Sequence, residues 1–297
     1  MTGPGALYRE DRRLAYLSIA PSVVLLVLLS LVPAIAVLRL SFQEVELGES
    51  PRFVGLDNYL WALASPDFLM ALKNSLVWTF GSVSLEMVVG LGIALMLHRS
   101  FHLRGLARVA VLAPYLVPTV VAVLAWRFMF HDILGVLNYM LISLGIVRSP
   151  VLWLDSPSWA MLSVILVGTW KFFPFVVIAL LGILQAIPTD QYEAARIDGA
   201  SAWQQFRLIT LPHIMPIFLL SAVLRTIWTF HKFDIIYLLT GGGPLNATTT
   251  LPVLVYLKGF VDFEFGRAAA VALLAMLLLS LVLVAYFTLL RRAEAHQ

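Results

Sequence analysis

Long apolar runs recur along almost the whole chain, and they restrict its fold more than any other feature. A bilayer core about 30 Å thick requires about 20 consecutive apolar residues in a helix. Six stretches reach this length, and they are Leu14–Leu40, Leu69–Leu97, Leu106–Phe130, Trp159–Leu184, Ile209–Phe230 and Ala268–Leu290. We therefore predict an all-α polytopic membrane protein with six transmembrane helices.

The composition leaves no room for a separate soluble domain. Hydrophobic residues make up 61% of the 297 residues and charged residues only 12%, whereas soluble domains have about 45–50% and about 25%. We expect a single transmembrane domain over residues 1–297. The absence of cysteine excludes disulfides and thiolate metal sites. A net charge of +3 is ordinary for a membrane protein in which Lys and Arg flank the spans, so nucleic acid is not an expected partner.

The cations predict the orientation of the chain. With six spans, both termini and the even-numbered loops share one side. That side carries Arg9, Arg12, Arg13, Arg99, Arg104, Arg108, Arg196, Arg207, Arg291 and Arg292. The opposite loops contain many acids, so the positive-inside rule predicts that both termini are cytoplasmic. The first apolar run is far longer than the h-region of a signal peptide, and we interpret it as an uncleaved helix. The outer segments 45–66 and 131–158 are predicted as short exposed connections.

The cytoplasmic loop at about 187–212 is predicted to be two short helices that meet at a glycine. Asp190 and Glu193 have the spacing of a capping box at the start of the first helix. Gly199 tolerates the positive φ of a helix end. Ser201 begins a second capping-box pattern. Such an element is suited to docking on another protein, and the alternative is an amphipathic loop on the membrane surface.

The same loop resembles the EAA loop of bacterial binding-protein-dependent ABC importer permeases. The matching residues, which that family uses to couple to its ATPase, are Glu193, Ala194, Ala195, Asp198, Gly199, Ile209, Leu211 and Pro212. The resemblance implies the fold of a type I ABC importer permease in the bacterial inner membrane. It also implies a paralogous permease, a dimer of cytoplasmic ATPases and an extracellular or periplasmic solute-binding protein as partners. The chain has no P-loop motif, so ATP and Mg would belong to the ATPase partners, and this chain would be neither an enzyme nor a holder of a cofactor.

Further stretches are similar to the carbohydrate-uptake branch of these permeases, of the maltose and glycerol-3-phosphate types. They are residues 55–59, 114–118, 169–175 and 233–244. By this resemblance the substrate contacts are Tyr115, Thr119, Lys171, Phe172, Phe175, Arg225, Thr229 and Lys232. The chain lacks the large periplasmic insertion of the maltose branch, so contacts made through that insertion do not carry over.

Three ionisable residues within the spans are functional candidates because charge is costly in a bilayer. They are Glu86, Lys171 and Arg225. Glu86 either pairs with one of the two cations or leaves both facing the pathway. Pairing fits a neutral sugar, and unpaired cations fit an anionic solute such as a glycerophosphodiester. A self-sufficient secondary transporter or channel and a polytopic enzyme are the alternatives from other classes. The histidines lack the spacing of a metal site, and no metal is expected.

Overall fold

The computed structural model describes residues 4–45 and 50–294, and the side chains of residues 14–45 and 50–288. The described elements are α1 (Pro4–Ser41), β1 (Gln43–Glu44), β2 (Arg52–Phe53), α2 (Asp57–Ala64), α3 (Pro66–His98), α4 (Arg104–Leu116), α5 (Thr119–Met129), α6 (Val136–Ser143), α7 (Pro157–Ala186), α8 (Thr189–Ile197), α9 (Ala202–Gln205), π-helix η1 (Phe206–Thr210), α10 (Leu211–Phe230), α11 (Asp234–Thr240), α12 (Leu251–Tyr256), π-helix η2 (Leu257–Val261) and α13 (Phe265–Glu294). The all-α prediction is confirmed. Part of the predicted outer segment 45–66, residues 46–49, lies outside the described residues, and so do the side chains of Arg9, Arg12, Arg13, Arg291 and Arg292.

The predicted spans largely correspond to helices. Within the described residues, five helices are long and apolar enough to cross a membrane, and a bent pair makes the number up to six. The bent pair is α4 and α5, which meet at 96°, and the bend falls at Pro118, one of the two prolines that interrupt the third apolar run. Pro118 lacks an amide hydrogen, and Val117 before it takes an extended backbone with ψ of 131°, as a residue that precedes proline does. The predicted outer connections were incomplete, because α2 and α6 lie in them.

The chain divides into two compact units, and each is described separately. The first comprises Met1–Leu63 and Tyr256–Leu273. In it, β1 and β2 form an antiparallel hairpin. Asn58 of α2 donates to the carbonyl oxygens of Ser41 and Gln43 at 3.0 and 2.9 Å, which fixes α2 against the chain after α1. Trp61 lies between two cations, with Lys258 at 5.5 Å and Arg267 at 4.7 Å from its ring centroid.

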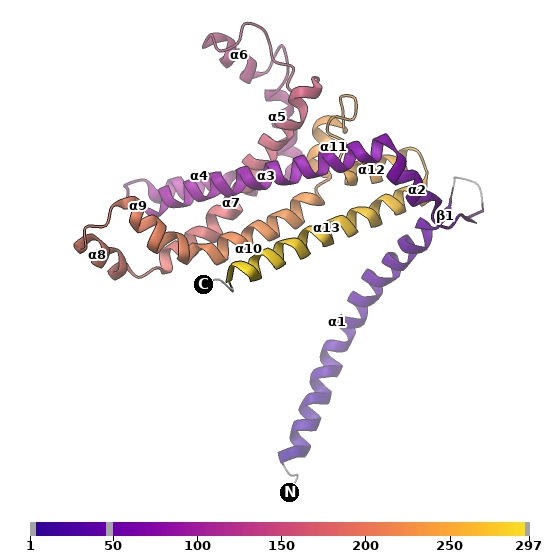
Figure 1. Cartoon of the computed structure of the whole chain (residues 1–297), viewed down its shortest axis with the longest axis horizontal. Helices are drawn as coiled ribbons and strands as arrows, with labels where there is room; N and C mark the ends of the chain where they lie inside the picture. Colours follow the sequence, from indigo (N-terminus) through magenta and orange to yellow (C-terminus); the bar gives the residue numbers. More distant parts are fainter. Residues whose placement is uncertain (1–3, 46–49, 295–297) are drawn as a thin grey trace. The chain divides into compact units, whose positions relative to one another are not determined.

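The second unit, Ala64–Val255 and Leu274–Gln297, contains a packed group of α3, α4, α7 and α10 (Figure 1). Small residues permit the closest approaches. A Cβ at Gly168 would lie 2.5 Å from the ring of Trp78, and one at Gly90 would lie 2.6 Å from Val176. Because lipid is as apolar as a leucine side chain, such close packing supplies much of the attraction between membrane helices.

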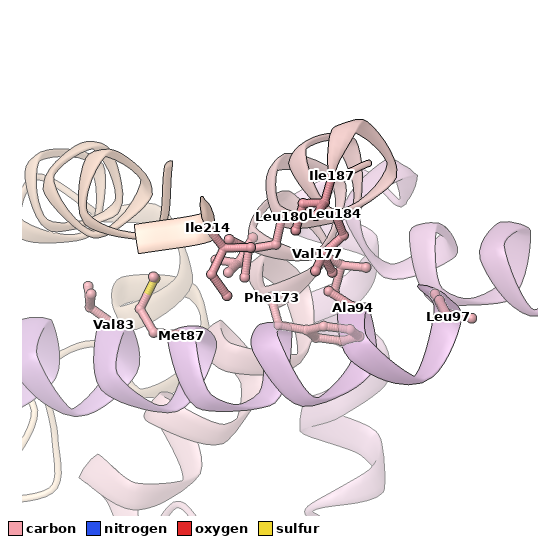
Figure 2. Close-up of a cluster of buried hydrophobic side chains, with 11 residues drawn as sticks. Val83, Met87, Ala94, Leu97, Phe173, Val177, Leu180, Leu184, Ile187 and Ile214 are labelled. Atoms are coloured by element: carbon pink, nitrogen blue, oxygen red, sulfur yellow. The ribbon is translucent and has the colours of Figure 1, made fainter. Parts of the chain in front are cut away.

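The core of the second unit lies where α3, α7 and α10 meet. Figure 2 shows that α3 contributes Val83, Met87, Ala94 and Leu97, that α7 contributes Phe173, Val177, Leu180 and Leu184, and that α10 contributes Ile214. The spacing of three, four and seven residues places each set on one helix face. This apolar cluster fixes α7 against α3 and α10, and so positions the polar residues described next.

Candidate functional site

A buried ion pair joins α3 to α10 in the second unit. Glu86 is 0% exposed and Arg225 is 2% exposed. Arg225 Nε donates to Oε2 of Glu86 at 2.6 Å, and Arg225 Nη2 donates to Oε1 at 2.9 Å. Two parallel charge-assisted bonds fix both side chains in one geometry. Of the two partners that the sequence left open for Glu86, the structure therefore selects Arg225 and not Lys171.

Thr229 extends this contact by one helical turn of α10. Its Oγ1 accepts a second bond from Arg225 Nη2 at 3.2 Å, and its carbonyl oxygen accepts from Trp78 Nε1 at 2.9 Å. Thr229 is 1% exposed. Arg225 and Thr229, both predicted as substrate contacts, thus also hold α10 against α3.

Lys171 of α7 meets the break between α4 and α5. Its Nζ donates to the carbonyl oxygen of Val117 at 2.6 Å and approaches that of Pro114 at 3.4 Å. In a continuous helix the Pro114 carbonyl would accept from the amide four residues later, but that residue is Pro118. The ammonium group takes the place of the missing donor, and it adds positive charge at the C-terminal end of α4.

Three cations lie close to one aromatic ring, that of Phe172. The ring centroid of Phe172 is 4.4 Å from Arg225 Cζ, 5.0 Å from Lys232 Nζ and 5.6 Å from Lys171 Nζ. The face of an aromatic ring attracts cations electrostatically. The edge-on ring of Tyr115 lies 6.3 Å from the same centroid. The ring of Phe172 thus contacts Tyr115, Lys171, Arg225 and Lys232, and Thr229 joins this group through its bond from Arg225. Thr119 and Phe175 are the two predicted contacts outside this group.

The remaining predicted contacts are more accessible than the ion pair. Tyr115 is 41% exposed, and Thr119, Phe175 and Lys232 are half-buried. Phe175 packs edge-on against Trp228, with ring centroids 5.2 Å apart. Within this cluster, these side chains are the ones that a solute could touch. Their role as substrate contacts stays a prediction.

A polar pocket near the C-terminal end of α5 was not identified from the sequence as a site. Arg127, His131 and Asp132 line it together with Asp155 and residues around Tyr237. The usable signal was a cation, Arg127, within the last turn of the third apolar run. Among the described residues, no group of three or more acidic, histidine or cysteine side chains is placed to hold a metal ion.

The loop before the fifth span forms the predicted helix–glycine–helix element. The first helix, α8, ends at Ile197, and Gly199 adopts a φ of 78°. The second capping box is confirmed, because Ser201 N donates to Gln204 Oε1 at 2.7 Å and Gln204 N donates to Ser201 Oγ. The first capping box was wrong. Helix α8 begins at Thr189 with Pro188 at its N-cap, two positions before Asp190, and no side chain caps it.

The exposed face of this element carries large apolar side chains as well as small ones. None of the α8 residues is buried, and Ala194 is exposed while Ala195 is half-buried. Ile197 is 87% exposed, and Trp203 is 67% exposed and stacks on Phe206. Apolar side chains at this exposure indicate a surface that another protein or a membrane covers.

The second short helix does not end where the fifth span was expected to begin. Residues Ala202–Phe230 form one continuous 29-residue helix. Its segment η1 is π-helical, with Leu211 N bonded to the carbonyl of Phe206. Ile209, Leu211 and Pro212 therefore lie within the helix. Tyr192 Oη is 2.9 Å from Thr210 Oγ1, and this hydrogen bond ties α8 to the same helix.

Comparison with known proteins identifies close relatives. Residues 87–295 match the family model described as "Binding-protein-dependent transport system inner membrane component". The chain is 38% identical to the trehalose/maltose transport system permease protein MalF of Thermococcus litoralis, over 95% of this chain and 93% of that one. It is 35% identical to the sulfoquinovosyl glycerol transport system permease protein SmoG of Agrobacterium fabrum, over 90% and 87%.

A solved structure has the same fold. A chain of a bacterial alginate ABC transporter, in complex with its alginate pentasaccharide-bound periplasmic protein, superposes with a TM-score of 0.85. The superposition covers 97% of this chain and 98% of that one, at 23% sequence identity. At this identity the likeness shows a shared fold. The broken third span and the helix–glycine–helix loop are features of this chain.

Proposed function

The chain belongs to the family of binding-protein-dependent transport system inner membrane components, and from this we propose that it is a permease subunit of an ATP-driven sugar importer. The observation that carries the proposal is the exposed helix–glycine–helix element, which bears the EAA residues and continues into a membrane-spanning helix. A self-sufficient transporter or channel has no need of such an exposed docking element. A polytopic enzyme has no need of it either.

The proposed partners follow from the family resemblance. A paralogous permease completes the pathway, a cytoplasmic ATPase dimer receives α8, and a solute-binding protein delivers the solute from outside. ATP and Mg bind to the ATPase chains. The exposed apolar side chains of Ile197 and Trp203 support a protein groove as the site where the element docks, because both would be covered there.

We assign an uncharged sugar as the solute class. The charge of Arg225 is compensated by Glu86 within the chain, and Lys171 is occupied by backbone carbonyls. The accessible Tyr115 and Phe175 offer aromatic faces, which suit the apolar faces of sugar rings. The name of the trehalose/maltose relative agrees with this assignment.

An anionic sugar derivative is the second candidate, because Lys232 is only half-buried and lies 3.8 Å from its nearest acid, Asp234. The relative named for sulfoquinovosyl glycerol supports it. Competition assays with the cognate binding protein and transport complex distinguish the two. Trehalose or maltose inhibits uptake under the first assignment, and only acidic sugars or glycerophosphodiesters inhibit it under the second.

The proposed mechanism is alternating access. Closure of the ATPase dimer moves α8, and the continuous helix from Ala202 carries this movement into the pathway. The termini and the loop 187–212 are placed in the cytoplasm, and the loop around Leu245 is placed outside. The distribution of Arg and Lys in the loops supports this orientation.

The coupling element gives a direct test of the transport assignment. Gly199→Pro imposes a φ of about −65° on a residue that has 78°, and Ala195→Trp adds bulk to the docking face. In a reconstituted complex, both variants should hydrolyse ATP with at least tenfold less transport per ATP. Gly92→Ala is the matched control, because a Cβ there meets no atom within 4 Å. Normal transport by the Gly199 and Ala195 variants would refute docking through this element.

A further inference from the structure

The turn between α3 and α4 concentrates positive charge. Residues 98–108 contain three arginines and two histidines and no acidic residue, and these basic residues are His98, Arg99, His102, Arg104 and Arg108. Apolar side chains alternate with them: Phe101 is 44% exposed, Leu103 66% and Leu106 67%. Mixed basic and apolar residues beside a membrane-spanning helix are typical of a segment that contacts lipid headgroups.

The charge of this turn is not neutralised within the described part of the chain. No ion pair with Arg99, Arg104 or Arg108 is found there. Arg104 Nε donates to the carbonyl oxygen of Leu97 at 2.7 Å, which fixes its side chain across the turn. Arg108 Nε is buried and has no hydrogen-bond partner, and the same holds for His98 Nδ1. A buried donor without an acceptor is costly, so the geometry is suited to an acceptor that comes from outside the chain.

An apolar groove begins at Arg108. It is lined by Leu97, by Val111 and Leu112 of α4, and by the α7 residues Val177, Ile178, Leu181, Gly182 and Gln185. Arg108 is the one charged residue in this lining. A Cβ at Gly182, one of the lining residues, would meet no atom within 4 Å, so there is open space at that position. The groove therefore combines one cation with a largely hydrocarbon surface.

We propose that this groove is a binding site for an anionic phospholipid. The phosphate oxygens accept from Arg108 and lie near Arg104, and an acyl chain lies along the α4–α7 surface. Basic pockets between membrane helices select anionic headgroups by charge. Arg99 lines the neighbouring pocket, whereas Arg104 is bonded to Leu97, which lines the groove, so Arg104 and Arg108 are the two cations assigned to the phosphate. The proposal goes beyond the proposed function, since it does not depend on the solute.

Lipid retention measured by native mass spectrometry tests the site. The full-length chain is exchanged into mixed micelles with equal amounts of phosphatidylglycerol and phosphatidylcholine, and the lipids that remain bound are counted. The wild type should retain phosphatidylglycerol preferentially. Arg108→Gln should lower its retention about fivefold, which is the factor for the loss of about 1 kcal/mol of attraction per cation. Arg148→Gln, a control remote from residues 98–108 in sequence and exposed, should leave retention unchanged.

A second variant separates a lipid from a free anion. Gly182→Leu fills the groove without removing a cation or straining the backbone, so it should also lower phosphatidylglycerol retention. Excess inorganic phosphate should not displace the lipid from the wild type. Equal retention of both lipids by the wild type would overturn the proposal. Retention that neither Arg108→Gln nor Gly182→Leu changes would overturn it, and so would full displacement by phosphate.

Discussion

Removing one member of the Glu86–Arg225 pair should be far more damaging than removing both. Arg225→Met leaves the Glu86 carboxylate 0% exposed and without its two donors, and Glu86→Gln leaves the guanidinium without its anion. Loss of one partner of a buried pair costs about 3–5 kcal/mol, whereas replacement of both is often neutral or stabilising. At about 1.4 kcal/mol per factor of ten, each single change should lower the ratio of folded to unfolded chain more than a hundredfold.

Thermal unfolding of the purified chain, together with uptake into proteoliposomes, measures these effects separately. The double variant Glu86→Gln with Arg225→Met should unfold close to the wild-type temperature, well above both single variants. Arg52→Met is the control, because it breaks the exposed pair with Glu44 and should cost at most about 1 kcal/mol. A double variant no more stable than the worse single variant would refute the reasoning. A stable double variant that no longer transports would show that Glu86 or Arg225 also serves the solute.

Two further predictions concern the helix break and the orientation. Lys171→Met should destabilise the chain by about 1.5–3 kcal/mol, the range for a charged hydrogen bond. In a Pro118→Ala background the loss should be smaller, because that substitution supplies an amide for the Pro114 carbonyl; equal losses in thermal melts of both backgrounds would contradict this role. On the cysteine-free sequence, Leu245→Cys should react with an impermeant maleimide in intact cells and Ile197→Cys should not; the reverse pattern would invert the orientation.

The long apolar runs predicted six spans, and the described residues contain five helices and one bent pair that could cross a membrane, but the runs did not predict the geometry of the spans. The prolines at positions 114 and 118 indicate an interruption of the run from Leu106 to Phe130, but hydrophobicity summed over a window does not give the angle of the bend. The 96° bend depends on a donor from another helix, Lys171, and such a tertiary contact leaves no local pattern. The fifth helix also begins earlier than predicted. No residue between Gln204 and Leu211 is a helix breaker, so the helix that begins at Ala202 continues into the span.

The helix–glycine–helix element was predicted more accurately than the polar cluster because its geometry depends on local contacts. A glycine with positive φ and the capping box at Ser201 depend on neighbours within four residues. The choice of Arg225 over Lys171 as the partner of Glu86 depends on how α3, α7 and α10 rotate against one another. That rotation is set by close approaches such as that of Gly168 to Trp78. Charge pairing across helices therefore had to remain an alternative until packing was known.

The π-helical segment between Phe206 and Thr210 contains one surplus residue relative to an α-helix. The wide π-turn absorbs that surplus residue, so the helix after it keeps nearly the phase that a regular α-helix one residue shorter would have. An α-helix turns about 100° per residue, so a deletion in the regular α-helical stretch after the π-turn would instead rotate Arg225 away from Glu86. The phase between the exposed loop and the buried ion pair thus depends on this widened turn as well as on the number of residues that separate them.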